Sequence, residues 1–158
     1  LKQTEDSRVI NVASGAHQFV KNMNFDDLQS KENYKPMQVY GQSKLANILF
    51  TKALSTKLSD FGVTVNCLHP GFVSTGIGSN NNKTLWTFLM FLAKPFARKT
   101  DKGAETSIYL CSSPEVENIS GEYFVDCKIE KISEAAKSSE QSESLWKIST
   151  ELTGIDLN

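Results

Sequence analysis

Short apolar runs alternate with segments of helical periodicity along the chain. Residues 8–13 form a β-branched and nearly continuous apolar run, which is typical of a parallel strand covered on both faces. Residues 63–68 form a second run of this kind, and residues 122–126 are a third strand candidate. Strands separated by helical segments predict an open α/β sheet with flanking helices.

The longest helical pattern covers residues 37–60, between a polar stretch that ends at Pro36 and a glycine, Gly62, placed as a C-terminal cap. Because its apolar residues form two adjoining stripes, the helix is expected to bury two sides. The first stripe is Leu45, Ile48, Leu49 and Ala53, and the second is Ala46, Phe50, Leu54 and Leu58.

Three later segments complete the expected elements. Residues 85–93 are too few for a membrane span and are expected to form a helix over the site. Their four aromatic or methionine residues leave contact with a membrane surface as an alternative. Thr100 and Asp101 are expected to cap a helix that stops before Pro114. The tail, residues 133–152, is predicted to be a polar helix with apolar contacts at Leu145, Trp146, Ile148 and Leu152.

Composition narrows the class of protein without selecting one. The chain has 158 residues, and its 17 Lys and Arg against 18 Asp and Glu give a net charge of −1, which argues against a dedicated nucleic-acid binder. Its three cysteines include no CxxC pair, so neither a disulfide framework nor a zinc site is expected. The two histidines, His17 and His69, are too few for a metal cluster and are expected to be structural.

The sharpest chemical signal is a tyrosine followed four positions later by a lysine, Tyr40 and Lys44. Residues with this spacing share one face of a helix. A tyrosine, whose ordinary pKa is about 10, is a poor base at neutral pH. An ammonium group beside it favours the phenolate, and the pair can then act as a general acid and base. The alternative for the isolated motif is an exposed aromatic ring and a solvated lysine.

The neighbouring strands add polar groups to this pair. Ser14 follows the first predicted strand, and Pro70 follows the second. In open α/β sheets ligands bind at the carboxyl ends of the strands, so these residues are expected to meet at one edge. A hydroxyl that holds a carbonyl oxygen, a phenol that moves its proton and an ammonium behind the phenol are suited to carbonyl–alcohol interconversion, with a hydride supplied by a cofactor.

These residues resemble the short-chain dehydrogenase/reductase family. The resemblance rests on RVINVAS at residues 8–14, on YxxxKxxN from Tyr40 to Asn47, and on HPGxVxT at residues 69–75. SKLAN at residues 43–47 and LWxxSxxLTG at residues 145–154 are similar to the retinol dehydrogenase-like branch. The resemblance implies the C-terminal half of a Rossmann-like, doubly wound parallel sheet, with about three strands and flanking helices.

The family pattern implies a role for each matching residue. Tyr40 would be the catalytic acid and base, and Ser14 would stabilise the substrate oxygen. Lys44 would support Tyr40 and hydrogen-bond the nicotinamide ribose. The remaining cofactor-binding positions would line the nicotinamide or hold its carboxamide or phosphates; they are Pro70, Gly71, Val73 and Thr75. Residues 76–96 would form a variable substrate lid.

One part of the family pattern has no counterpart in this sequence. Neither the glycine-rich turn of the nucleotide-binding half nor the family's catalytic asparagine is present. The resemblance therefore implies that residues 1–158 are the catalytic and substrate-lid portion of one domain, without its N-terminal nucleotide-binding half. The implied function is hydride transfer between NADP and a hydrophobic alcohol or carbonyl, with NAD as the alternative cofactor. The location is open: the cytosol, or the cytosolic face of a membrane if an anchor precedes the chain.

Two alternatives concern what the chain associates with. A non-catalytic binding or scaffold protein on the same half-fold is the rival to the enzyme, because the residues that would hold adenine and pyrophosphate are missing. The two-sided apolar helix around Leu49 and Phe50 also permits the helix-paired homodimer that is common in the family.

Overall fold

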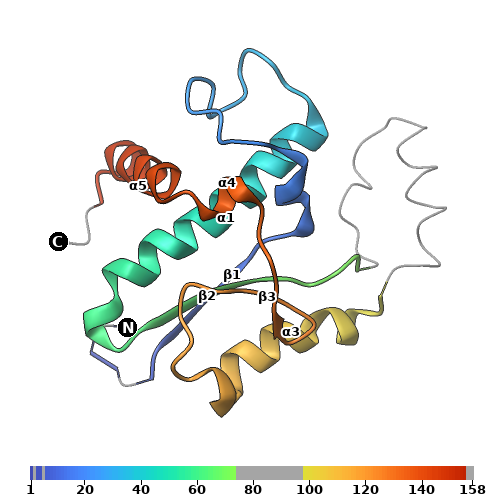
Figure 1. Ribbon diagram of the computed structural model, residues 1–158, viewed down its shortest axis with the longest axis vertical. Coiled ribbons are helices and arrows are strands. Elements are labelled where there is room, and N and C mark those ends of the chain that lie inside the picture. The colour runs from blue at the N-terminus through green and yellow to red at the C-terminus, as the bar shows by residue number, and fades with distance from the viewer. Residues whose placement is uncertain (2, 5, 74–97, 156–158) are drawn as a thin grey trace.

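One sheet organises the described part of the chain. Figure 1 shows the computed structural model, which describes all residues except 2, 5, 74–97 and 156–158. Within these residues the strands follow the order β1-β2-β3-β4. β1 (Arg8–Val12), β2 (Thr64–His69) and β3 (Tyr123–Val125) are parallel. The three predicted strands are confirmed, and a short antiparallel β4 (Lys128–Ile129), which was not predicted, follows them.

Helices lie on both faces of this sheet (Figure 1). On one face lie α1 (Pro36–Lys57), α4 (Glu134–Lys137) and α5 (Ser139–Thr153), and on the other lies α3 (Thr100–Ser112). Short 3-10 helices connect these elements: η1 (Gly15–Phe19) follows β1, η2 (Ser59–Phe61) follows α1, and η4 (Pro114–Val116) follows α3. The expected α/β class is confirmed, because parallel strands with helices on both faces define it.

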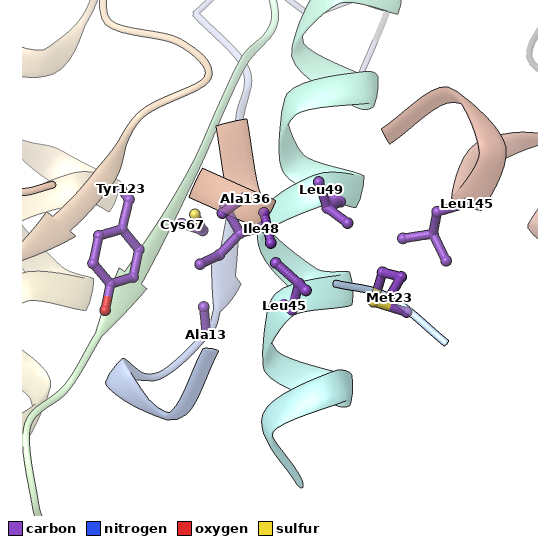
Figure 2. Close-up of a cluster of buried hydrophobic side chains, with 10 residues drawn as sticks. Ala13, Met23, Leu45, Ile48, Leu49, Cys67, Tyr123, Ala136 and Leu145 are labelled. Carbon is purple, nitrogen blue, oxygen red and sulfur yellow. The ribbon is translucent and has the colours of Figure 1, made fainter. Parts of the chain in front are cut away.

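Successive residues of the strands point to opposite faces of the sheet and join the hydrophobic core on each face. In β3, Tyr123 joins the cluster beneath α1, whereas Phe124 joins Leu68 and Leu110 beneath α3. Figure 2 shows the α1 side, where Cys67 and Tyr123 from the strands meet leucine and isoleucine side chains of α1. A strand with apolar residues on both faces therefore reads as a continuous apolar run in the sequence.

The two apolar stripes on α1 are both covered. Leu45, Ile48 and Leu49 are at most 1% exposed and pack against the sheet side of the core. Phe50, in the second stripe, stacks on Trp146 of α5 with 5.5 Å between ring centroids. The prediction that the helix buries two sides is confirmed. Within the described residues, Leu54 and Leu58 of the second stripe pack with Val65 of β2, and Phe50 packs on the C-terminal helix.

Several predicted helix ends are wrong in detail. Thr100 and Asp101 lie inside α3, whose N-cap is Lys99, and its side chain makes no capping bond. The predicted tail helix is two helices, because Ser133 caps α4 and Ser138 caps α5 with their side-chain oxygens. Gly62 has the expected left-handed conformation, with φ of +66°, but it ends η2 rather than α1.

Two predictions about apolar segments have different outcomes. Leu152, expected as an apolar contact of the tail helix, is 67% exposed, whereas Leu145 is buried. The apolar run at residues 85–93, with its alternative of membrane contact, lies outside the described residues. Among the helices that are described, none has the length and hydropathy that crossing a membrane requires.

A tight turn joins β3 to β4. Its two central residues, Asp126 and Cys127, both have positive φ, at 51° and 60°. A two-residue connection with positive φ at both positions is a type I′ turn, whose twist matches that of the flanking strands. Because neither residue is glycine, local sequence alone does not predict this turn.

Candidate functional site

The carboxyl ends of β1 and β2 lie side by side. The Ala13 N–H continues the strand ladder by donating to the Leu68 carbonyl oxygen at 2.8 Å. A Cβ atom added to Gly15 would lie 3.6 Å from His69 Nε2. The turn that follows β1 therefore contacts the end of β2, as expected for a parallel pair.

Ser14 begins the turn after β1. Its backbone is extended and its Oγ accepts the Ala16 N–H at 3.2 Å, which caps η1. The residue is 9% exposed. Because this bond uses a lone pair of Oγ, the hydroxyl proton of Ser14 stays available for another acceptor.

Tyr40 and Lys44 lie one turn apart near the beginning of α1. The Lys44 ammonium is 5.5 Å from the centroid of the Tyr40 ring, within the range of a cation–π contact. Tyr40 is 40% exposed. The Lys44 Nζ donates to the Val12 carbonyl oxygen at 3.3 Å, and Val12 is the last residue of β1. The lysine thus connects the tyrosine on the helix with the strand that leads to Ser14.

A glycine brings the helix against the turn that contains Ser14. A Cβ atom on Gly41 would lie 3.0 Å from the Ala16 carbonyl oxygen and 3.1 Å from Val20 Cγ1. Gly41 is buried, and it directly follows Tyr40. Only a residue without a side chain lets η1 approach α1 this closely, so Gly41 determines how near Ser14 and Tyr40 can lie.

A row of polar side chains on α1 extends the contact with β1. Asn47 donates to the Val12 carbonyl oxygen at 3.0 Å, the same acceptor that Lys44 uses. One turn further, Thr51 accepts from the Asn11 amide at 2.9 Å and donates to the Asn47 carbonyl oxygen at 2.8 Å. Asn47 has no role of its own in the sequence pattern, although its spacing of three from Lys44 places it on the same helix face.

The segment after β2 contains Pro70, Gly71 and Val73, which follow His69 at the same edge of the sheet. Gly71 has a φ of +81°, and a Cβ atom there would lie 2.8 Å from the Arg98 side chain. Val73 forms an isolated parallel bridge with Arg98. The backbone conformation at position 71 therefore favours glycine, and a larger residue there would displace the Arg98 side chain.

Arg98 also pairs with Asp126 in the turn after β3. Its NH2 donates to Oδ2 at 2.9 Å and its NH1 donates to Oδ1, a bidentate ion pair. The hydrogen bond from Arg98 holds the pKa of Asp126 below its usual range. Burial, followed by the charge of Arg98, lowers the pKa of His69, whose Nδ1 is buried without a hydrogen-bond partner among the described residues. The sequence does not predict this pair, because no pattern links residues 28 positions apart.

Most of the predicted site residues lie at one edge of the sheet. Ser14 follows β1, while Pro70, Gly71 and Val73 follow β2. Tyr40 and Lys44 lie in the first turns of α1, which packs on η1. Thr75 and the expected lid at residues 76–96 lie outside the described residues.

The short chain dehydrogenase family model matches residues 1–86, which include Tyr40, Lys44 and the strand that precedes Ser14. The chain belongs to the short-chain dehydrogenase family.

Curated relatives lie in the retinol dehydrogenase branch. The chain is 42% identical to retinol dehydrogenase 14 of Homo sapiens over 157 residues, which cover 98% of this chain and 46% of the relative. It is 40% identical to retinol dehydrogenase 12 of Mus musculus over 155 residues, which cover 98% of this chain and 48% of the relative. The chain thus spans about half the length of the curated relatives it matches.

Solved structures share the fold. An uncharacterized protein from Mycobacterium Paratuberculosis superposes with a TM-score of 0.69 at 26% identity, and the match covers 96% of this chain and 52% of that one. An NADPH-bound short chain oxidoreductase from Pseudomonas aeruginosa PAO1 superposes with a TM-score of 0.55 at 16% identity, covering 78% of this chain and 46% of that one. At this lower identity the likeness concerns the fold alone. The expected Rossmann-like class is confirmed, and the chain covers about half of these structures.

Proposed function

We propose that this chain carries the catalytic residues of an oxidoreductase that transfers hydride between a nicotinamide cofactor and a hydrophobic alcohol or carbonyl. The observation that carries the proposal is the placement of the Lys44 ammonium 5.5 Å from the Tyr40 ring, next to the turn of α1 that packs on η1, which Ser14 caps. These three residues supply groups with complementary roles in alcohol oxidation.

Tyr40 moves the proton in this proposal. A phenolate at Tyr40 takes the hydroxyl proton of an alcohol during oxidation, and the neutral phenol returns it to the carbonyl oxygen during reduction. The nearby Lys44 charge stabilises the phenolate because opposite charges attract, and the bond from Lys44 to Val12 holds that charge in place. The exposure of Tyr40, at 40%, lets a substrate reach the phenol oxygen.

Ser14 orients the substrate oxygen. Its Oγ already accepts the Ala16 N–H, so its own proton can be donated to an oxygen that is bound beside it. A donor held in place before the reaction stabilises charge that develops on the oxygen. Since η1 packs on Gly41, this donor stays next to the turn of α1 that carries Tyr40.

The described residues fit the nicotinamide end of a cofactor. Lys44 has three N–H donors, and among the described residues only the bond to Val12 uses one of them, so others can reach ribose hydroxyls. Pro70, Gly71 and Val73 would lie along the nicotinamide. A bound nicotinamide accepts hydride when an alcohol is oxidised and supplies it when a carbonyl is reduced. We propose NADP as this cofactor, with NAD as the alternative, as the resemblance to the retinol dehydrogenase-like branch implies.

An apolar substrate suits the surface around these residues. Large apolar side chains remain exposed at the same edge: Val12 at the end of β1 is 50% exposed, Phe19 in η1 is 58% exposed, and Phe72 after β2 is 43% exposed. Exposed apolar surface of this kind is typical of ligand-binding sites. The relatives are named for retinol, which is a hydrophobic alcohol, and this supports the same substrate class here.

The test measures NADPH-dependent reduction of a hydrophobic aldehyde by this chain, and by the same chain extended upstream in its reading frame. Tyr40→Phe and Lys44→Ala are each expected to lower kcat/KM at least about 100-fold, the usual scale of acid–base catalysis. The matched control is Tyr34→Phe, because Tyr34 is 70% exposed and lies outside the site, and its activity is expected to equal that of the wild type.

Two results would contradict the proposal. One is wild-type turnover by Tyr40→Phe or Lys44→Ala. The other is the absence of turnover by both forms of the wild-type protein, which would favour a non-catalytic binding or scaffold role on the same half-fold.

A further inference from the structure

His17 is the most deeply buried ionisable side chain near the proposed site. It is 0% exposed, although a histidine ring carries two polar nitrogens. It lies in η1, three residues after Ser14. The proposed mechanism does not use His17, so the contacts of its ring must explain why a polar side chain is buried there.

Both ring nitrogens of His17 have partners. Nδ1 lies 2.8 Å from the Ser14 carbonyl oxygen, and Nε2 lies 3.2 Å from the backbone nitrogen of Ser133. The edge of the ring also meets the Tyr123 ring, with 5.2 Å between the centroids. The imidazole thus joins the turn after β1 to the segment that begins α4.

The two partners determine where the ring carries its proton. The backbone N–H of Ser133 can only donate, so Nε2 must accept and carries no hydrogen. The Ser14 carbonyl can only accept, so Nδ1 must carry the hydrogen and donate it. His17 is therefore the neutral Nδ1–H tautomer, set by its two hydrogen bonds.

From these contacts we infer that His17 is a positioning residue for Ser14. The inference rests on the proposed function, in which the Ser14 hydroxyl holds the substrate oxygen. The Ser14 carbonyl oxygen accepts the His17 Nδ1–H and also the backbone N–H of His17, at 3.2 Å, and Ser14 Oγ accepts the Ala16 N–H. With both the backbone and the side chain of Ser14 held, the position of Oγ is set before a substrate arrives, and its proton can turn toward the bound oxygen.

The second hydrogen bond of His17, from the Ser133 N–H to Nε2, holds the imidazole ring in place. Ser133 caps α4, and the two alanines that follow it, Ala135 and Ala136, are buried in the cluster that also contains Ala13. Ser133 is thereby held by the core rather than by solvent. Because Ser133 donates to Nε2, rotation of the ring away from Ser14 would leave the half-buried Ser133 N–H without this partner.

A pair of substitutions at His17 distinguishes the effect of its hydrogen bond to Ser14 from the effect of its hydrogen bond to Ser133. The amide nitrogen of asparagine can take the place of Nδ1, so His17→Asn keeps a donor for Ser14 and loses the acceptor for Ser133. The amide oxygen of glutamine can take the place of Nε2, so His17→Gln keeps the acceptor and loses the donor. If His17 positions Ser14, we expect kcat per folded protein to be about tenfold higher in His17→Asn than in His17→Gln, with KM similar.

Imidazole ¹⁵N spectra of the unsubstituted protein provide a measurement that does not depend on turnover. We expect one histidine with a protonated Nδ1 and an unprotonated Nε2, and its signals should disappear in either variant. The opposite tautomer at His17 overturns the inference even if both variants fail to fold.

The activity results distinguish this inference from the proposed function. Equal kcat in His17→Asn and His17→Gln, with a normal wild type, overturns the positioning role alone. Absence of turnover by the wild type, or full activity of Tyr40→Phe, overturns the proposed function and the positioning role with it. The expected tautomer together with the tenfold difference supports the positioning role.

Discussion

Asn66 in β2 makes two side-chain hydrogen bonds to the segment that precedes β3. It is 4% exposed, its Nδ2 donates to the Ile119 carbonyl oxygen at 2.5 Å, and its Oδ1 accepts the Glu122 N–H at 3.0 Å. These bonds hold the segment before β3 against β2. The change Asn66→Ala removes both of them and leaves the backbone of both partners in place.

The expected loss follows from the burial of these backbone groups. A buried polar group left without its partner costs about 1 to 3 kcal/mol. Ile119 is half-buried, so the loss of the bond to its carbonyl oxygen should cost an amount in the middle of this range. Glu122 is exposed, so water can partly replace the bond to its N–H. We therefore expect Asn66→Ala to lower the free energy of unfolding by about 2 to 3 kcal/mol.

Urea unfolding followed by circular dichroism measures this difference. The matched control is Asn118→Ala, because Asn118 is exposed in the same segment, and its effect should stay within about 0.5 kcal/mol. A loss below about 1 kcal/mol in Asn66→Ala, or one equal to that of the control, would refute the reasoning.

Two further predictions concern the C-terminal helix and a buried thiol. Trp146→Ala removes a half-buried ring that stacks on Phe50, so it should lower the free energy of unfolding by about 2 kcal/mol. The control Leu152→Ala should lower it by about 0.5 kcal/mol or less, because the Leu152 side chain is 67% exposed. Equal losses for the two variants in urea unfolding would contradict this prediction. Burial raises the pKa of Cys67 from 9.0 to about 12. As the pH rises from 9 to 12, the Cys67 thiol ionises in the unfolded chain but stays neutral in the folded one. The free energy of unfolding should therefore fall over this range, by about 1.4 kcal/mol at about pH 10. In urea unfolding, the free energy of unfolding of Cys67→Ala should fall less with rising pH than that of the wild type. The same fall in both proteins would contradict this prediction.

Elements with a strong local pattern could be predicted from the sequence. The strand β2 has a nearly continuous apolar run, and α1 has two stripes that recur with helical spacing. Tyr40 and Lys44 lie on one helix face as their spacing requires. In each of these cases neighbours in the chain are also neighbours in space, so the local pattern contains the information.

Features that depend on contacts between distant segments could not be predicted in this way. β4 is two residues long, and its turn has positive φ at Asp126 and Cys127, a conformation that their residue types do not indicate. The tail pattern is continuous, yet the helix breaks at Ser138 because its side chain caps the following helix. The bidentate pair between Arg98 and Asp126 joins segments that no repeat or motif connects.

The sequence by itself determined the family, the strands that carry the site and the residue types available for proton transfer, because these depend on composition and on spacing along the chain. Tertiary structure decided which groups meet. It brought η1 against Gly41, placed two donors on the Val12 carbonyl, and set the tautomer of His17 by supplying Ser133 from a segment 116 positions away. Hydrogen bonds and close packing act over a few ångströms, and only the folded chain places distant residues within that range.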